Sequence, residues 1–198
     1  MSSYPYAWQH FRTITRHRHL VMKYCFRMGL YRQGLAHDLS KYTPTEFLEG
    51  AVWWQGTRSP NNKAREEKGY SRAWLHHKGR NKHHFEYWID YGLNCDTIIR
   101  GVPIPRRYIA EMVADRISAS RVYKGDAYTD RSAYEYFVRG KKRLWFVHKD
   151  VVAQLEFLLK MVADEGEDKA IDYIKNVYLK GKPLPDSVVI TEPFKDTV

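Results

Sequence analysis

The chain has only two cysteines among its 198 residues, Cys25 and Cys95, and no C-x-x-C pair, so thiols give no lead to its chemistry. It also has no apolar run near the roughly 18–20 residues that cross a bilayer, and no signal-peptide pattern at its N-terminus. We therefore expect a cytoplasmic protein with reduced thiols and no membrane partner.

Internal repeats, low-complexity segments and the strand–helix alternation of parallel sheets are missing too, and helical periodicity dominates instead. Apolar residues recur at helical spacing over about 8–28 and over 149–164, where we predict a core helix. Further helices are predicted over 35–41, 44–55, 72–78 and 82–91, from Pro105 to about 122, and over 132–139 and 167–179. The sequence thus predicts an all-α, single-domain helical bundle over residues 1–180, with an extended tail over 181–198.

Three helix starts carry recognisable capping residues. Thr43, Pro44 and Glu46 have the pattern of a capping box, in which the Glu46 side chain reaches back to the start of the helix. Ser71 is predicted to cap the next helix, and Asn81 the one after it. The polar residues 56–68 are predicted to form a loop that leads into a short helix.

Positive charge exceeds negative charge, with 33 Lys and Arg against 23 Asp and Glu and a net charge of +10. This excess favours anionic partners such as phosphate esters, nucleotides or nucleic acid. Many small proteins are basic without such a role, and charge alone does not separate a small phosphate-containing substrate from a nucleic-acid polymer.

The most informative segment is His37-Asp38-Leu39-Ser40-Lys41, which places two metal-ligating side chains next to each other in a predicted helix. Further candidate ligands precede and follow it: His17, His19, His76, His77, His83, His84 and Asp115. Imidazole and carboxylate together suit zinc, iron, manganese or cobalt. We therefore predict a metal site to which several helices of the bundle contribute inward-facing residues.

His17 is the preferred first ligand. It lies four residues before Val21, on the helix face that also carries Met28, and should point inward. His19 is the alternative, but it shares its face with Lys23, which suggests solvent. Taken alone, His17 would be explained more simply as a hydrogen-bonded core or surface residue. The His37-Asp38 pair makes a role as metal ligand the better explanation.

The doublets His76-His77 and His83-His84 place four histidines within nine positions. Adjacent helical residues point about 100° apart, so one member of each doublet is expected to face the site. Buried neutral imidazoles need partners, which argues against simple core filling. We assign His77 and His84 as ligands, and His76 and His83 as supporting groups or substrate contacts. A basic, solvent-facing loop that binds phosphate or nucleic acid is the alternative.

Asp115 is the predicted closing ligand. Ser118 and Ala119, one turn further along, are small and permit close approach of another helix or of an ion. The alternative is a surface pair of Asp115 with Arg116, with Glu111 on the same solvated face.

The order His … His-Asp … His … Asp resembles the HD superfamily of metal-dependent phosphohydrolases. The blocks around residues 37–42 and 83–88 are similar to an uncharacterised family of HD-like bacterial proteins over nearly the whole chain. The resemblance implies an all-helical fold and a centre of one or two divalent ions. It also implies catalytic roles for Asp38 and for Lys41, which stands where some HD proteins have a lysine that contacts the scissile phosphate.

The leading hypothesis is hydrolysis of a small phosphate ester, including nucleotides, by a metal-bound hydroxide. Lys41 would neutralise the phosphate, and a basic rim of Arg80, Asn81 and Lys82 would extend its binding site. An HD-type di-iron oxygenase would use the same ligands for a different reaction. A basic nucleic-acid-binding protein without catalytic activity is the third hypothesis.

Overall fold

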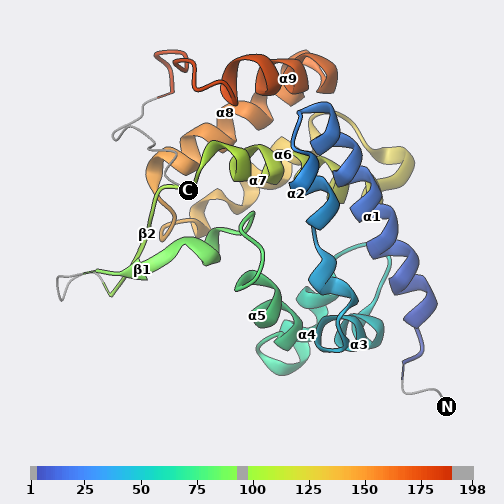
Figure 1. The fold of residues 1–198 in the computed structure, drawn as a ribbon. Coiled ribbons are helices and arrows are strands. Elements are labelled where there is room, and N and C mark those ends of the chain that lie inside the picture. Colours follow the sequence, from blue (N-terminus) through green and yellow to red (C-terminus); the bar gives the residue numbers. More distant parts are fainter. Residues whose placement is uncertain (1–3, 93–97, 189–198) are drawn as a thin grey trace.

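The computed structural model describes residues 4–92 and 98–188 and confirms a mostly helical fold (Figure 1). Its α-helices are α1 (Ala7–Arg27), α2 (Tyr31–Ala36), α3 (Pro44–Trp53), α4 (Pro60–Lys68), α5 (Arg72–Lys78), α6 (Arg106–Lys124), α7 (Ser132–Gly140), α8 (Lys149–Glu165) and α9 (Glu167–Tyr173). Short 3-10 turns lie at Leu39–Tyr42, Phe85–Trp88, Gly125–Ala127 and Lys141–Arg143, and a π-helical turn, Ile174–Tyr178, follows α9. None of the described helices is both long and apolar enough to span a bilayer.

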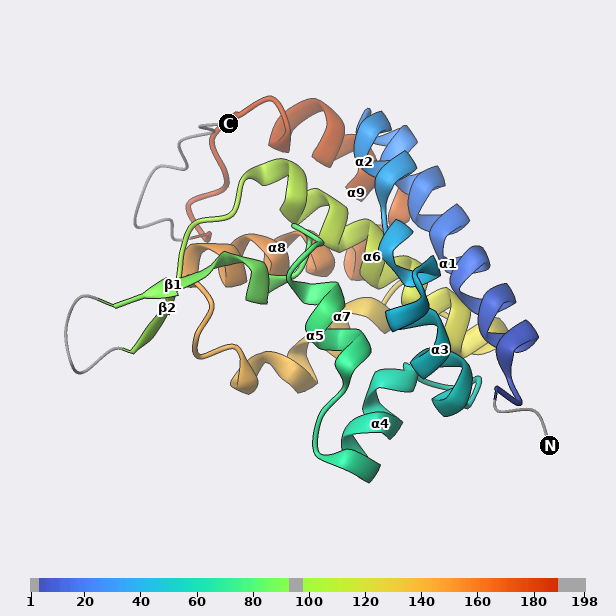
Figure 2. The same cartoon turned by 60° about the horizontal axis from the view of Figure 1, so that its bottom comes forward.

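The hydrophobic core is built around α6, which lies between α1 and α8 (Figure 2). α8 confirms the core helix predicted from its periodicity, since Val151, Leu155 and Leu158 are fully buried. Burial of each such side chain stabilises the fold by about 1.5–3 kcal/mol. A second group of helices, α3, α4 and α5, packs together at one end of α1 (Figure 1). The candidate site lies where the two groups meet.

The predicted helix over 35–41 is wrong at its two most important residues. α2 ends at Ala36, and His37, its C-cap, is extended. Asp38 adopts a left-handed conformation with φ of 55°, alone among the non-glycine residues that the structure describes. Such a conformation costs about 1–3 kcal/mol and clusters at functional sites, where the surroundings enforce it. Because the helix ends before them, the side chains of His37 and Asp38 can both be buried. In a continuous helix with one face in solvent, two consecutive side chains would not both point inward.

The predicted helix over 82–91 is also wrong. After Asn81 the chain forms a turn, the 3-10 turn Phe85–Trp88 and then strand β1 (Ile89–Tyr91), which pairs antiparallel with β2 (Ile99–Gly101). Isoleucine and tyrosine favour such a strand over a helix. Cys95 lies outside the described residues, as does the predicted tail beyond residue 188. The described part of that tail, 181–188, contains no helix.

The predicted caps had different outcomes. Ser71 is confirmed, since its side-chain oxygen accepts a hydrogen bond from the Trp74 N–H at 3.1 Å. At α3, Thr43 is the N-cap and Pro44 the first helical residue, as predicted, but the capping box is wrong because the Thr43 side chain makes no cap hydrogen bond. Glu46 is instead buried and accepts hydrogen bonds from His76 and His77. A carboxylate that the pattern assigns to a helix end therefore serves the histidine cluster.

Candidate metal centre

The centre forms where four segments meet. α1 supplies His17, the break after α2 supplies His37 and Asp38, and α6 supplies Asp115. The end of α5 and the turn after it supply three histidines, His77, His83 and His84. α1 packs against α6, α2 and α3, and α3 packs against α5. The helix contacts that bury the core therefore also bring these ligand types together.

Three groups of potential ligand atoms are present: His37, His83 and Glu111 form one, and the other two, called the first and the second group below, share Asp38. The first group consists of His17, His37, Asp38 and Asp115, and its ligand atoms lie within 4.8 Å of one another. His17 Nε2 is 3.0 Å from Asp115 Oδ1 and 3.5 Å from Asp38 Oδ2, and His37 Nε2 is 3.3 Å from Asp38 Oδ2. Two imidazoles and two carboxylates in this arrangement could hold one divalent ion.

The second group consists of Asp38, His77, His83 and His84. Here the other carboxylate oxygen is used: Asp38 Oδ1 is 3.2 Å from His77 Nε2 and 3.4 Å from His83 Nε2. Asp38 therefore offers one oxygen to each group. A carboxylate in this position is suited to bridge two ions.

Six buried polar atoms of the two groups lack hydrogen-bond partners among the described residues. They are His17 Nε2, His37 Nε2, both carboxylate oxygens of Asp38, His83 Nε2 and His84 Nε2. Several lie within ion-pair distance of one another, and Asp38 Oδ2 also lies 2.6 Å from Lys41 Nζ, but none of these contacts has hydrogen-bonding geometry. Buried groups left this way are costly and rare in folded proteins. Metal coordination would satisfy all six, so the donor set fits one or two divalent ions.

Two buried glutamates orient the imidazoles from outside. Glu111 Oε1 lies 2.8 Å from His37 Nδ1 and 3.1 Å from His83 Nδ1, and Gln33 Nε2 donates to Glu111 Oε2. Glu46 Oε2 lies 2.7 Å from His77 Nδ1. A carboxylate at Nδ1 fixes the tautomer that leaves Nε2 free for a metal. Glu111 contacts one histidine of each group and so connects the two.

Electrostatics keep the carboxylates charged. Burial would raise the pKa of Asp38, but the charges of His37, Lys41 and His77 outweigh it and hold this pKa well below its usual range. Burial would also raise the pKa of Glu111, yet hydrogen bonds with His37 and His83 lower it to about 2. The Asp38 and Glu111 carboxylates are therefore ionised at neutral pH.

The histidines divide into two kinds. Burial would lower the pKa of His83, but the neighbouring carboxylates of Asp38 and Glu111 outweigh it and raise this pKa to about 10. Burial and the charges of His83 and His77 lower the pKa of His84 well below its ordinary value, so His84 is neutral. A metal ion at this centre would take the place of the proton on His83.

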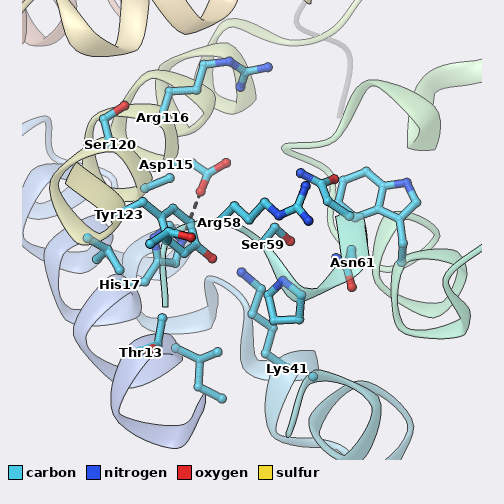
Figure 3. Close-up of a pocket in the computed structure, with 18 of the residues that line it drawn as sticks. Thr13, His17, Lys41, Arg58, Ser59, Asn61, Asp115, Arg116, Ser120 and Tyr123 are labelled. Atoms are coloured by element: carbon cyan, nitrogen blue, oxygen red, sulfur yellow. Dashed lines mark ion pairs between the residues drawn. The ribbon is translucent and has the colours of Figure 1, made fainter. Parts of the chain in front are cut away.

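A cavity of about 460 Å³ lies against the centre. Its lining includes four of the potential ligands, His17, His77, His84 and Asp115, together with Lys41. It also includes Arg58, Ser59, Asn61, Arg116, Ser120 and Tyr123, which Figure 3 shows around the same opening. Arg58 and Ser59 come from the polar segment before α4, which was predicted only as a loop.

A family model matches residues 6–161, well over half of the chain. The chain belongs to DUF5662. This is a family of unknown function, so membership assigns no reaction. No curated protein and no solved structure matches the chain significantly.

All six residues predicted as ligands in this DUF5662 chain lie in the two groups. His17 is buried and His19 exposed, as the helical face of His17 indicated. His77 and His84 lie in the second group, but His83, assigned as a supporting group, lies there too. His76 lies outside both groups and hydrogen bonds Glu46.

The position of Glu111 contradicts the alternative in which Glu111 lies on a solvated face of α6. Glu111 is 4% exposed, and its carboxylate faces the histidines rather than water. Its spacing of one helical turn from Asp115 was a usable signal, since residues four apart share a face. The role of Glu46 had no such signal, because its pattern matched a helix cap.

The predicted phosphate rim is not where it was expected. The exposed Arg80 donates to the His76 carbonyl oxygen, and Lys82 lies over the rings of Tyr87 and Tyr108. Asn81 donates to Ser40 Oγ and the His77 carbonyl oxygen. None of these three, nor His76 or His83, lines the described cavity. Lys41 does, and its Nζ lies 2.6 Å from Asp38 Oδ2.

Proposed function

We propose that this DUF5662 protein is a metal-dependent phosphohydrolase that cleaves a small phosphate ester, with nucleotides among the candidates. The observation that carries the proposal is Asp38, whose two unsatisfied oxygens each face one ligand group. Divalent ions bound there would polarise a phosphoryl oxygen and lower the pKa of a bound water towards about 7. The resemblance of the ligand order to HD-domain proteins supports the same chemistry.

Lys41 supports a phosphate-bearing substrate. Its side chain is 29% exposed, lines the cavity and forms an ion pair with Asp38. Burial would lower the pKa of Lys41, but the charges of Asp38 and Asp115 raise it above its ordinary value, so the ammonium stays protonated. A fixed positive charge beside the ligand groups would neutralise a phosphoryl group and hold it in place.

The cavity favours a small molecule over a polymer. Its volume of about 460 Å³ lies within the roughly 300–1,000 Å³ typical of small-ligand pockets. His17 and His84, two of the residues with an unsatisfied buried ligand atom, line this cavity together with Asp115. This arrangement suits a substrate that enters the cavity, and it gives less support to a nucleic acid bound across the surface.

An HD-type oxygenase is the second candidate, because the donor set is rich in nitrogen. Five imidazoles and two carboxylates make up the two groups, and imidazole with carboxylate suits iron as well as zinc or manganese. Iron content and consumption of dioxygen distinguish this reaction from hydrolysis.

The test is a screen of phosphate esters with protein purified without chelators and then supplied with manganese, iron, zinc or cobalt. We expect phosphate release that depends on the metal and is lost in Asp38→Ala. The matched control is Asp90→Ala, an exposed aspartate on β1 outside the centre. Metal-loaded protein that releases phosphate from no ester, and consumes dioxygen with a substrate instead, would overturn the hydrolase proposal.

A further inference from the structure

The part of the cavity away from the metal ligands is lined by several cations. They are Arg58, Arg116, Lys124 and Arg139. The acidic residues in the described lining, Glu46 and Asp115, are already engaged with histidines of the centre. The outer cavity therefore has a positive potential that its own wall does not neutralise.

Arg58 differs from the other three cations. Its guanidinium holds both carboxylate oxygens of Glu66, at 2.5 and 2.7 Å, so its charge is compensated. This pair fixes the segment before α4 as a wall of the cavity. Arg58 is therefore left out of the proposed anion site.

Arg116, Lys124 and Arg139 form no ion pair with any carboxylate in the described part of the chain. The Arg116 guanidinium lies over the Phe85 ring at 5.1 Å and reaches only the Met112 carbonyl oxygen, at a long 3.4 Å. Lys124 donates to the neutral Ser132 hydroxyl. All three keep the capacity to bind an anion.

These cations are separate from Lys41. Arg116 and Lys124 belong to α6 and Arg139 to α7, which packs against α6, whereas Lys41 belongs to the 3-10 turn Leu39–Tyr42. Figure 3 shows Arg116 and Lys41 on opposite sides of Asp115. Apolar and aromatic side chains line the cavity along the same two helices, namely Ala119, Val122, Tyr123 and Tyr136.

We propose that Arg116, Lys124 and Arg139 bind a second anionic group of the substrate. The substrate class is then a small phosphate ester that carries a further phosphate or carboxylate on a short, partly apolar spacer. The identity of the scissile end rests on the proposed function, whereas the second subsite does not require metal. A guanidinium is well suited to it, because its donors match phosphate or carboxylate in a bidentate way.

The test is calorimetry with metal-stripped protein and two probes, a linear diol bisphosphate and the monophosphate of the alcohol of equal chain length. We expect the bisphosphate to bind about tenfold more tightly, as a charge-assisted contact would give. Arg116→Met and Arg139→Met should each remove most of that preference. Lys142→Met, which changes an exposed lysine outside the cavity, should keep it.

Equal binding of the two probes by the wild-type chain would overturn the second subsite, and so would a preference unchanged in both arginine variants. Arg139 is exposed, so Arg139→Met keeps the test valid if Arg116→Met fails to fold. A third probe, a phosphate ester with a terminal carboxylate, shows which anion is preferred. Arg116-dependent binding by a protein that takes up no metal would support the subsite and contradict the proposed hydrolase. Metal-dependent hydrolysis without any preference for a second anion would support the proposed hydrolase and contradict the second subsite.

Discussion

The metal-ligand cluster and the cluster around Glu167 are both built from charged and polar side chains beneath the surface, but only one of them is internally satisfied. The Glu167 carboxylate accepts hydrogen bonds from the hydroxyls of Tyr24 and Tyr128 and from the Arg121 guanidinium. No buried side-chain atom of this described cluster lacks a partner. At the metal-ligand cluster, six such atoms do.

This difference in hydrogen bonding indicates different roles for the two clusters. A satisfied polar network stabilises and specifies a fold, here by joining α1, α6 and α9 through Glu167. A cluster in which several buried donors and acceptors lack a hydrogen bond is less stable unless a ligand supplies the missing interactions. The left-handed backbone of Asp38 adds to that cost. We infer that the metal-ligand cluster is arranged for a ligand and the Glu167 cluster for the fold.

Asp38→Ala should have the largest effect, because Asp38 gives one oxygen to each ligand group. We expect both groups to lose their metal. Turnover should fall by more than about a hundredfold, which exceeds the effect of removing a residue that only hydrogen bonds a ligand. Elemental analysis and initial rates measure the two losses, and circular dichroism checks the fold. Metal retained at the wild-type stoichiometry would contradict the bridging position of Asp38.

Glu111→Gln should have the next largest effect, because its carboxylate holds one histidine of each group. We expect about 10–100-fold weaker binding of both ions. Glu46→Gln is the matched variant, and it should weaken mainly the second group, through His77. Competition with a chelating dye measures the two affinities. Equal effects of the two variants on each ion would show that Glu111 does not connect the groups.

Glu167→Gln should lower stability and leave metal binding unchanged, because the partners of Glu167 belong to the fold and not to the metal centre. We expect a loss of about 1–3 kcal/mol in the free energy of unfolding, from weakened charged hydrogen bonds, with metal content unchanged. Thermal melting and elemental analysis on the same sample test this. A Glu167→Gln protein that melts like the wild type but has lost metal would remove the distinction between the two clusters.

His10 separates an isolated buried histidine from a ligand. Its Nδ1 lacks a partner among the described residues, yet His10 belongs to neither ligand group. Burial, with the charge of Lys41, lowers its pKa to about 4. Because the unfolded chain binds this proton at higher pH than the folded one, stability should fall as the pH drops from about 6.5 to 4, by up to about 3 kcal/mol.

His10→Gln should flatten this part of the stability profile. Urea unfolding of the two proteins at a series of pH values provides the comparison. The two metal-free proteins should differ most in slope between pH 4 and 6.5 and agree above pH 7. Parallel profiles across that range would show that His10 does not remain neutral in the fold.

Features that depend on local periodicity were predictable from the sequence. The inward face of His17 and the burial of α8 follow from apolar residues three and four positions apart. The Ser71 cap follows from the preference of serine for that position. These signals lie within a few residues of the feature they predict.

Features that depend on partners far along the chain were not predictable. Helical spacing indicated that Glu111 shares a face with Asp115, but its burial depends on His37 and His83 from other segments. The end of α2 at Ala36 depends on the burial of two consecutive ligands, which overrides helix propensity. The cavity cations became visible only when α6, α7 and the segment before α4 were placed around one space.

Metal analysis of the wild-type chain, purified without chelators and compared with Asp38→Ala, tests the central claim most directly. If the six unsatisfied atoms are metal ligands, the wild-type protein should contain one to two equivalents of a transition metal, and Asp38→Ala should contain almost none. A folded wild-type protein without stoichiometric metal, which also takes up no manganese, iron, zinc or cobalt when each is supplied, would contradict it.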